Sequence, residues 1–118
     1  MEFMLIFASP QDKLDAEFDP SKAESALEPW KAYMGAMAAA GIMRGGKRLQ
    51  HPSTATTVRS RNGKRQVQDG PFADSKEQAS GFVIIDVPSI DEALKWAERA
   101  PSTLYGGTEV RPIVEMSM

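Results

Sequence analysis

Two short segments restrict the fold of this chain more than any other feature of its sequence. In residues 2–8 (EFMLIFA) both faces of an extended chain are apolar, and in residues 81–87 (GFVIIDV) they are apolar apart from Asp86. A strand of this kind lies inside a sheet and is covered on both sides, whereas an outer strand alternates apolar and polar residues. We therefore expect these segments to be the two middle strands of one sheet.

Helical signals follow each of these strands. Leu27, Trp30, Met34 and Met37 recur at steps of three or four, which predicts an amphipathic helix that ends at Gly41. We expect Asp19 or Ser21 to cap this helix, with Pro29 at its start or at a kink. Residues 89–92 (SIDE) form a capping box that opens a second helix ending before Pro101.

Outer strands are predicted at residues 42–50 and 108–115. Gly45-Gly46 indicates a bulge or a close approach in the first of them, and Pro112 favours an edge position for the second. The order is then β-α-β, an inserted hairpin, and β-α-β, which is typical of a ferredoxin-like α+β sandwich (βαββαβ). With 118 residues the chain corresponds to one domain, residues 1–118.

The inserted hairpin is predicted at residues 54–69. Asn62-Gly63 is typical of a type I′ turn, which needs positive φ at both central residues. A two-residue turn pairs Val58 with Val67 and Thr56 with Asp69. Two neighbouring segments carry weaker signals: residues 11–19 are polar and predict a loop, and residues 74–77 (DSKE) predict a cap and one helical turn.

The predicted topology leaves one sheet face without helices. Two helices can cover only one face, so the other would expose a row of apolar side chains to water, and such patches normally mark an interface. We expect a homodimer in which the sheets of two copies pack together.

Composition excludes several chemistries. There is no cysteine and one histidine, so we expect no disulfide, thiolate nucleophile or zinc site, and no cofactor motif is present. Residues 29–68 contain eight basic and no acidic residues, although the net charge of the chain is −2. No aromatic residue except His51 interrupts the basic run 44–65, so we expect no nucleic-acid binding. Without a leader or a membrane segment, we expect a cytoplasmic protein.

Specific strings resemble one known family. These are residues 55–59 (ATTVR), 69–77 (DGPFADSKE), 81–82 (GF), 91–93 (DEA) and 109–112 (EVRP). Together they resemble the DGPF family within the YCII-related superfamily, over almost the whole chain. The resemblance implies a bacterial source, a dimeric α+β barrel and a small pocket in each subunit.

The resemblance also implies a departure from that superfamily's chemistry. Better-understood YCII-like proteins are associated with a His-Asp pair whose histidine lies on the first helix, and Trp30 occupies that position here. His51 follows the second strand, where we expect an exposed loop residue. A pocket walled by Trp30, with or without Tyr33 on the same helix, remains compatible with the sequence.

Asp69 is the candidate catalytic residue. The hairpin register places its carboxylate beside Val67 and Val58, where desolvation would favour a general base. The alternative is that Asp69 accepts backbone N–H groups and fixes the Gly70-Pro71 turn.

Six further residues are candidates for ligand binding, and each has a structural alternative. Trp30 and Phe72 could line a pocket or fill the core, and Lys76 and Glu77 could contact a ligand or cap a helical turn. Arg59 and Arg111 could bind a carboxylate or form ion pairs, Arg111 across the dimer.

Two classes of function stay open at this stage. One is a small-molecule-binding dimer, with or without cofactor-free acid–base catalysis, whose pocket is bounded by Trp30, Arg59, Asp69, Phe72 and Lys76. The other is a non-catalytic regulatory or protein-interaction module, because the resemblance implies an association of some members with sigma-factor-like regulators.

Overall fold

The structure is a computed structural model, and it describes residues 1–116. Its main sheet has four antiparallel strands in the order β2-β5-β1-β6. The middle strands are β1 and β5, as the two-sided apolar segments predicted, and Leu5 pairs with Val83. The bounds are β1 Glu2–Pro10, β2 Met43–Arg48, β5 Glu77–Asp86 and β6 Gly107–Pro112. This arrangement confirms the ferredoxin-like α+β fold.

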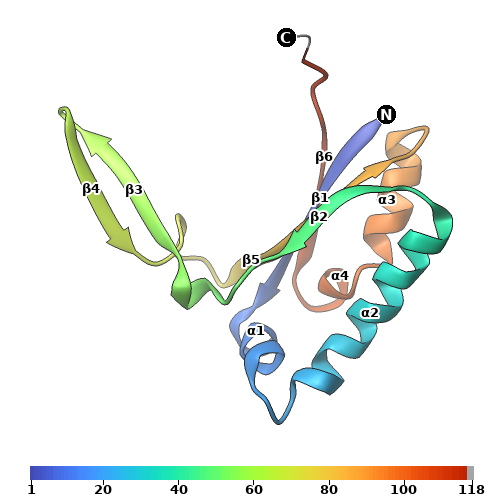
Figure 1. The fold of residues 1–118 in the computed structure, drawn as a ribbon, viewed down its shortest axis with the longest axis horizontal. Helices are drawn as coiled ribbons and strands as arrows, with labels where there is room; N and C mark the ends of the chain where they lie inside the picture. The colour runs from blue at the N-terminus through green and yellow to red at the C-terminus, as the bar shows by residue number, and fades with distance from the viewer. Residues whose placement is uncertain (117–118) are drawn as a thin grey trace.

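The long helices lie on one side of the sheet (Figure 1). They are α2 (Ala23–Ala40) and α3 (Ile90–Glu98), and two shorter helices, α1 (Gln11–Phe18) and α4 (Pro101–Tyr105), lie beside the same sheet end. The side chains of Phe3, Leu5 and Phe7 point from β1 towards the helices and are buried. They pack in one core with Tyr33 and Met37 of α2. Apolar residues of the opposite sheet face are only partly buried: Met4, Ile6, Phe82 and Ile84.

Several predicted ends of elements are confirmed. Gly41 adopts φ 69° after α2, the left-handed conformation that favours glycine at a helix end. Ser89 caps α3, because its hydroxyl accepts a hydrogen bond of 3.3 Å from the N–H of Glu92. Pro112 lies on β6, an edge strand, as its missing N–H required.

The loop predicted for residues 11–19 is wrong, because most of it is helix α1. Leu14 and Glu17 lie one turn apart and are both buried, so tertiary packing of this face offsets the polar composition. The cap predicted for α2 is also wrong. Asp19 accepts hydrogen bonds from the N–H and hydroxyl of Ser21, and α2 begins later, with Lys22 as N-cap and Pro29 inside the helix.

The helical turn predicted for residues 74–77 is absent from the structure. This segment is an irregular loop, and β5 already begins at Glu77. The side-chain amide of Gln78 donates to the carbonyls of Ala73 (2.7 Å) and Ser75 (3.0 Å). These bonds satisfy carbonyl groups that a helical turn would have used.

The glycine pair in β2 forms the predicted bulge. The register between β2 and β5 shifts between Met43 and Gly45. A Cβ atom on Gly46 would lie 2.8 Å from the carbonyl oxygen of Phe82. The strands thus approach each other at a point where only glycine fits.

The inserted hairpin has the predicted register. Strands β3 (Thr56–Arg61) and β4 (Lys64–Asp69) form a separate two-stranded sheet in which Val58 pairs with Val67. Asn62 and Gly63 have φ values of 54° and 75°, as the type I′ turn requires. Figure 1 shows the hairpin projecting away from the main sheet and the helices. A 3₁₀ turn, Pro52–Thr54, leads into it.

Candidate functional site

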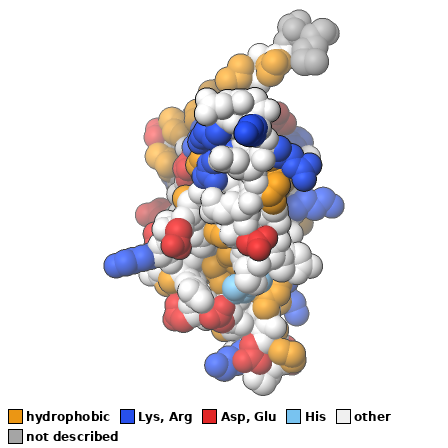
Figure 2. Space-filling model, turned by 90° about the vertical axis from the view of Figure 1, so that its left-hand side faces the viewer, with side chains coloured by type: hydrophobic (Ala, Val, Ile, Leu, Met, Phe, Trp, Pro, Cys, Tyr) orange, Lys and Arg blue, Asp and Glu red, His pale blue; other side chains and the backbone are white. Residues whose placement is uncertain are grey.

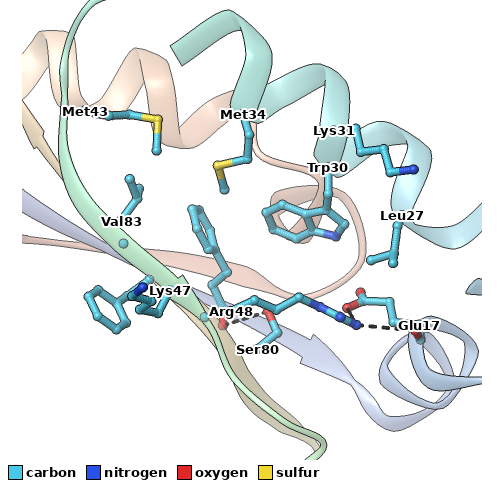
Figure 3. Close-up of a pocket in the computed structure, with 14 residues that line it drawn as sticks. Glu17, Leu27, Trp30, Lys31, Met34, Met43, Lys47, Arg48, Ser80 and Val83 are labelled. Atoms are coloured by element: carbon cyan, nitrogen blue, oxygen red, sulfur yellow. Dashed lines mark hydrogen bonds and ion pairs between the residues drawn. The ribbon is translucent and has the colours of Figure 1, made fainter. Parts of the chain in front are cut away.

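A cavity of about 370 Å³ lies between α2 and the sheet, next to α1 (Figure 3). Most of its wall is apolar and includes Phe7, Trp30 and Met34. Polar side chains line it from α1, α2, β2 and β5: Glu17, Lys31, Arg48 and Ser80. Its size lies in the range of about 300–1,000 Å³ that is typical of small-molecule sites.

The amphipathic face of α2 builds one wall of this cavity. Leu27, Trp30 and Met34 line it from successive turns. The Trp30 ring packs edge-to-face on Phe7 of β1, with ring centroids 4.9 Å apart. Because Phe7 is buried on a middle strand of the sheet, this contact fixes one side of the indole against the core.

Glu17 is the main polar group at one end of the cavity. Its side chain is 5% exposed, and its Oε1 atom lies 3.7 Å from Nη2 of Arg48, whose side chain remains about half exposed. Arg48 also donates to the backbone carbonyl of Glu17. Burial raises the pKa of the Glu17 carboxyl, and the Arg48 guanidinium and the Trp30 indole oppose this shift without cancelling it. Figure 3 shows Trp30 and Arg48 directed towards the end of the cavity where Glu17 lies.

Two buried polar atoms near Glu17 have no hydrogen-bond partner among the described residues. They are Nε1 of Trp30 and Oγ of Ser9. The Tyr105 hydroxyl is close to both of these atoms. Burial raises the pKa of Tyr105, and the charge of Glu17 raises it further, whereas the Trp30 indole and the Ser9 hydroxyl lower it. Only Trp30 of these two lines the cavity, and its N–H lies close to the Glu17 carboxyl and the Tyr105 hydroxyl without forming a hydrogen bond to either. A buried donor without a partner is costly, so a ligand oxygen could supply the missing acceptor here.

This arrangement can hold and move a proton. A carboxyl with a raised pKa is more readily protonated near neutral pH than an exposed one, and a proton can pass between it and a ligand oxygen. The unpaired indole N–H and the Arg48 guanidinium can stabilise negative charge on that oxygen.

Of the predicted site residues, only Trp30 lies in this cavity. Asp69 is exposed at the base of the hairpin, and its carboxylate makes no hydrogen bond within the described residues. The apolar surroundings expected for it are missing in the single chain, because Val58 and Val67 are themselves exposed. The carboxylate of Asp69 also does not accept the backbone N–H group of the Gly70-Pro71 turn, because the N–H of Gly70 donates to the Ala55 carbonyl instead.

The other predicted residues lie apart from one another. The Arg59 guanidinium lies over the ring of Phe72, 5.0 Å from its centroid, and Phe72 is 77% exposed. Arg111 pairs with Glu109 of its own strand. Lys76 and Glu77 are exposed, and Lys76 lines a smaller depression of about 210 Å³ beside α1. The single pocket predicted from these residues is therefore not formed by one chain, and their part in ligand binding stays a prediction.

His51 lies in a loop after β2, as predicted, but the exposure predicted for it is wrong. His51 is half-buried, and its Nε2 lies 2.7 Å from Oδ1 of Asp15 in α1. Its Nδ1 accepts a hydrogen bond from the N–H of Ser53, and its ring meets the edge of Phe18. Helix α1 thus pairs with the end of β2 through Glu17 and with the segment after β2 through Asp15.

Glu17 and Arg48 in the cavity, and Ser9 and Tyr105 near them, were not predicted from the sequence. The available signal was the spacing of Leu14 and Glu17, which places an acid beside an apolar residue on one face once residues 11–18 are taken as a helix. Within residues 1–116, no group of three or more potential ligand side chains is placed to hold a metal ion. No helix in this range has the length and apolarity needed to cross a membrane.

The fold and the cavity define a ferredoxin-like α+β protein with a mainly apolar cavity that opens to solvent. The model of the YCII-related domain matches residues 1–117, so the chain belongs to the YCII-related family. An uncharacterised protein of Rhizobium meliloti (strain 1021) is 47% identical over 70 residues, which are 56% of this chain and 55% of that protein. The match thus spans about half the length of this curated relative.

One solved structure is similar over nearly the whole chain. It is the 5-chloro-2-hydroxyhydroquinone dehydrochlorinase TftG of Burkholderia phenoliruptrix, in complex with 2,5-dihydroxybenzoquinone. The similarity covers 98% of this chain and 96% of that one, with a TM-score of 0.51 and 19% sequence identity. At this identity the comparison establishes a shared fold.

Proposed function

We propose that the cavity binds a small, mainly apolar molecule with a hydroxyl or carbonyl group, and that Glu17 exchanges a proton with that group. The observation that carries this proposal is a buried carboxyl with a raised pKa at the end of an apolar cavity, beside an indole N–H without a partner. A carboxyl whose pKa is raised by burial is more easily protonated than an exposed one, which suits it to acid–base work.

The cavity favours a flat, ring-shaped ligand. Phe7 and Trp30 offer aromatic surfaces, and Met34 offers an adaptable one. The dihydroxybenzoquinone bound to the structural relative is a ring of this class, with oxygen substituents. Lys31 and Arg48 add positive charge to the wall, which favours a ligand oxygen that carries negative charge.

The proposed step transfers one proton. The Glu17 carboxylate accepts the proton of a ligand hydroxyl and becomes a neutral carboxyl, while the ligand oxygen becomes an oxyanion facing the Trp30 N–H and Arg48. The reverse transfer returns the proton to the ligand. Either direction uses only side chains of this chain, and the neutral carboxyl is the form that burial favours.

Titration calorimetry with 2,5-dihydroxybenzoquinone as the probe tests this proposal. The hydroxyls of this probe are vinylogous acids that are ionised at neutral pH, so the probe brings an oxyanion and no proton of its own. Its charge raises the pKa of the Glu17 carboxyl further, and we expect Glu17 to take up a proton from solvent on binding. Proton uptake is measured from the dependence of the binding enthalpy on the buffer. We expect Glu17→Gln to abolish it and Glu28→Gln, which alters an exposed acid on α2, to preserve it. Absence of binding, or equal proton uptake in both variants, would contradict the proposal.

The regulatory alternative has no support from the family or from the relatives described above. We retain the homodimer as a proposal, because the sheet face opposite the helices leaves Met4, Ile6, Phe82 and Ile84 only partly buried. Sedimentation tests it: a stable monomer of 12.9 kDa at micromolar concentration would contradict it. The cytoplasmic location also stays a prediction.

A further inference from the structure

We propose that the β3–β4 hairpin is an arm that packs its Val58–Val67 face against a second copy of the chain. This inference rests on the homodimer proposed above and adds a contact that the sheet face does not provide. The partner of the arm is a second copy that packs on the open face of the main sheet, which is the face opposite the helices.

The hairpin is isolated within one chain. All residues of β4 are exposed, and the paired side chains of Val58 and Val67 are 62% and 52% exposed. A two-stranded hairpin without further packing is marginally stable in water. The arm also expands the molecule: the radius of gyration is 16.0 Å, against about 13–14 Å for a compact chain of this length. The opposite face is partly covered, because Arg59 lies over Phe72, whereas the Val58–Val67 face lacks a packing partner.

The position of the hairpin suits a second copy. In Figure 1 the helices α2 and α3 lie on one side of the sheet, and the hairpin projects towards the other side. That is the side on which Met4, Ile6, Phe82 and Ile84 lie partly exposed. If a second copy packs on the open face, the arm of the first copy lies along the side of the second. This contact would be continuous with the proposed contact between the two sheets.

Charge favours the same occupant. The hairpin carries four basic residues and one acid, or +3: Arg59, Arg61, Lys64, Arg65 and Asp69. Figure 2 shows Lys and Arg side chains gathered at the hairpin end of the molecule, with acidic side chains further down. Residues 11–28 carry six acids and two lysines, or −4. Arg65 lies on the Val58–Val67 face, and the other three basic side chains lie on the opposite face. The charge of the arm therefore attracts the α1–α2 region of another copy over a distance, and a twofold axis allows this to occur twice.

The first experiment measures amide hydrogen exchange of the full chain at concentrations above and below the midpoint of dimerisation. We expect the amides of β3 and β4 to be protected in the dimer and to exchange at least tenfold faster in the monomer. A dimer whose hairpin exchanges as fast as in the monomer would overturn the arm and leave the sheet contact standing. A chain that stays monomeric would overturn both, and neither result bears on ligand binding in the cavity.

The second experiment uses matched variants. Val67→Asp and Gln66→Asp place the same charge on opposite faces of β4, at positions that are both exposed in one chain. We expect the dimer dissociation constant to rise more than tenfold for Val67→Asp and less than threefold for Gln66→Asp.

A deletion variant covers the case in which Val67→Asp only unfolds the hairpin. Thr56 and Asp69 are cross-strand partners, so Gly-Gly can replace residues 57–68. We expect this variant to keep the circular dichroism of the folded body and to dimerise at least tenfold more weakly. An unchanged dimer dissociation constant would overturn the proposal. It would also be overturned if the hairpin amides exchanged freely in the dimer and the arm bound DNA in a salt-sensitive manner.

Discussion

The close approach of β2 and β5 at Gly46 leads to a sharp prediction about stability. A Cβ atom at this position would lie 2.8 Å from the Phe82 carbonyl oxygen and 3.1 Å from the Cα atom of Val83. Both atoms belong to the backbone of a middle strand and cannot rotate away. Gly46→Ala must therefore separate the strands locally, and overpacking of this kind costs about 1–3 kcal/mol.

Thermal unfolding followed by circular dichroism measures this cost. For a chain of this size we expect the midpoint to fall by roughly 4–12 °C. Gly45→Ala is the matched control, because its Cβ atom would meet only the Ile84 Cδ1 atom, at 3.9 Å. That variant should be neutral or more stable by up to about 1 kcal/mol, since alanine loses less entropy on folding than glycine. Equal midpoints for the two variants would refute the argument from strand spacing.

Four further outcomes follow from the structure. Because the pKa of Glu17 is raised in the folded chain, its contribution to the unfolding free energy is complete below the ordinary value of 4.5 and is lost as pH rises through the raised pKa. Chemical denaturation across pH should show this loss of unfolding free energy in the parent and in Glu28→Gln. The loss should be absent in Glu17→Gln. Trp30→Phe keeps an aromatic wall but removes the indole N–H, so calorimetry should show probe binding weakened by roughly 2- to 13-fold, the worth of one hydrogen bond. Ser89→Ala removes the cap of α3 and should cost about 1 kcal/mol in urea unfolding. Asp69→Asn should change unfolding free energy by less than about 0.5 kcal/mol and leave probe binding unaltered, because the carboxylate is exposed.

Much of the fold follows from local signals that tertiary packing reinforces. The two-sided apolar segments became β1 and β5, and the Asn62-Gly63 pair set the hairpin register residue by residue. The failures occurred where packing overrode local composition. Residues 11–18 form a helix because Leu14 and Glu17 are buried, and residues 74–77 do not, because the Gln78 side chain satisfies the loop carbonyls.

The site was harder to predict than the fold. Trp30 was identified through its helical spacing, but Glu17 is an acid in a polar segment, and nothing local indicates its burial. Its raised pKa depends on contacts among α1, α2 and the end of β2, which only the folded chain brings together. The DGPF segment drew attention to Asp69 instead, and that residue is exposed on the arm.

Nuclear magnetic resonance of the two indole N–H groups tests the proposed site most directly. The chain has two tryptophans: Trp30 lines the cavity with its N–H unpaired, and Trp96 lies on α3, outside the cavity lining. On titration with 2,5-dihydroxybenzoquinone we expect the Trp30 signal to move downfield and saturate, as its N–H gains an acceptor, while the Trp96 signal stays in place. A Trp30 signal that is unchanged, or that moves no more than that of Trp96, would contradict ligand binding beside Glu17.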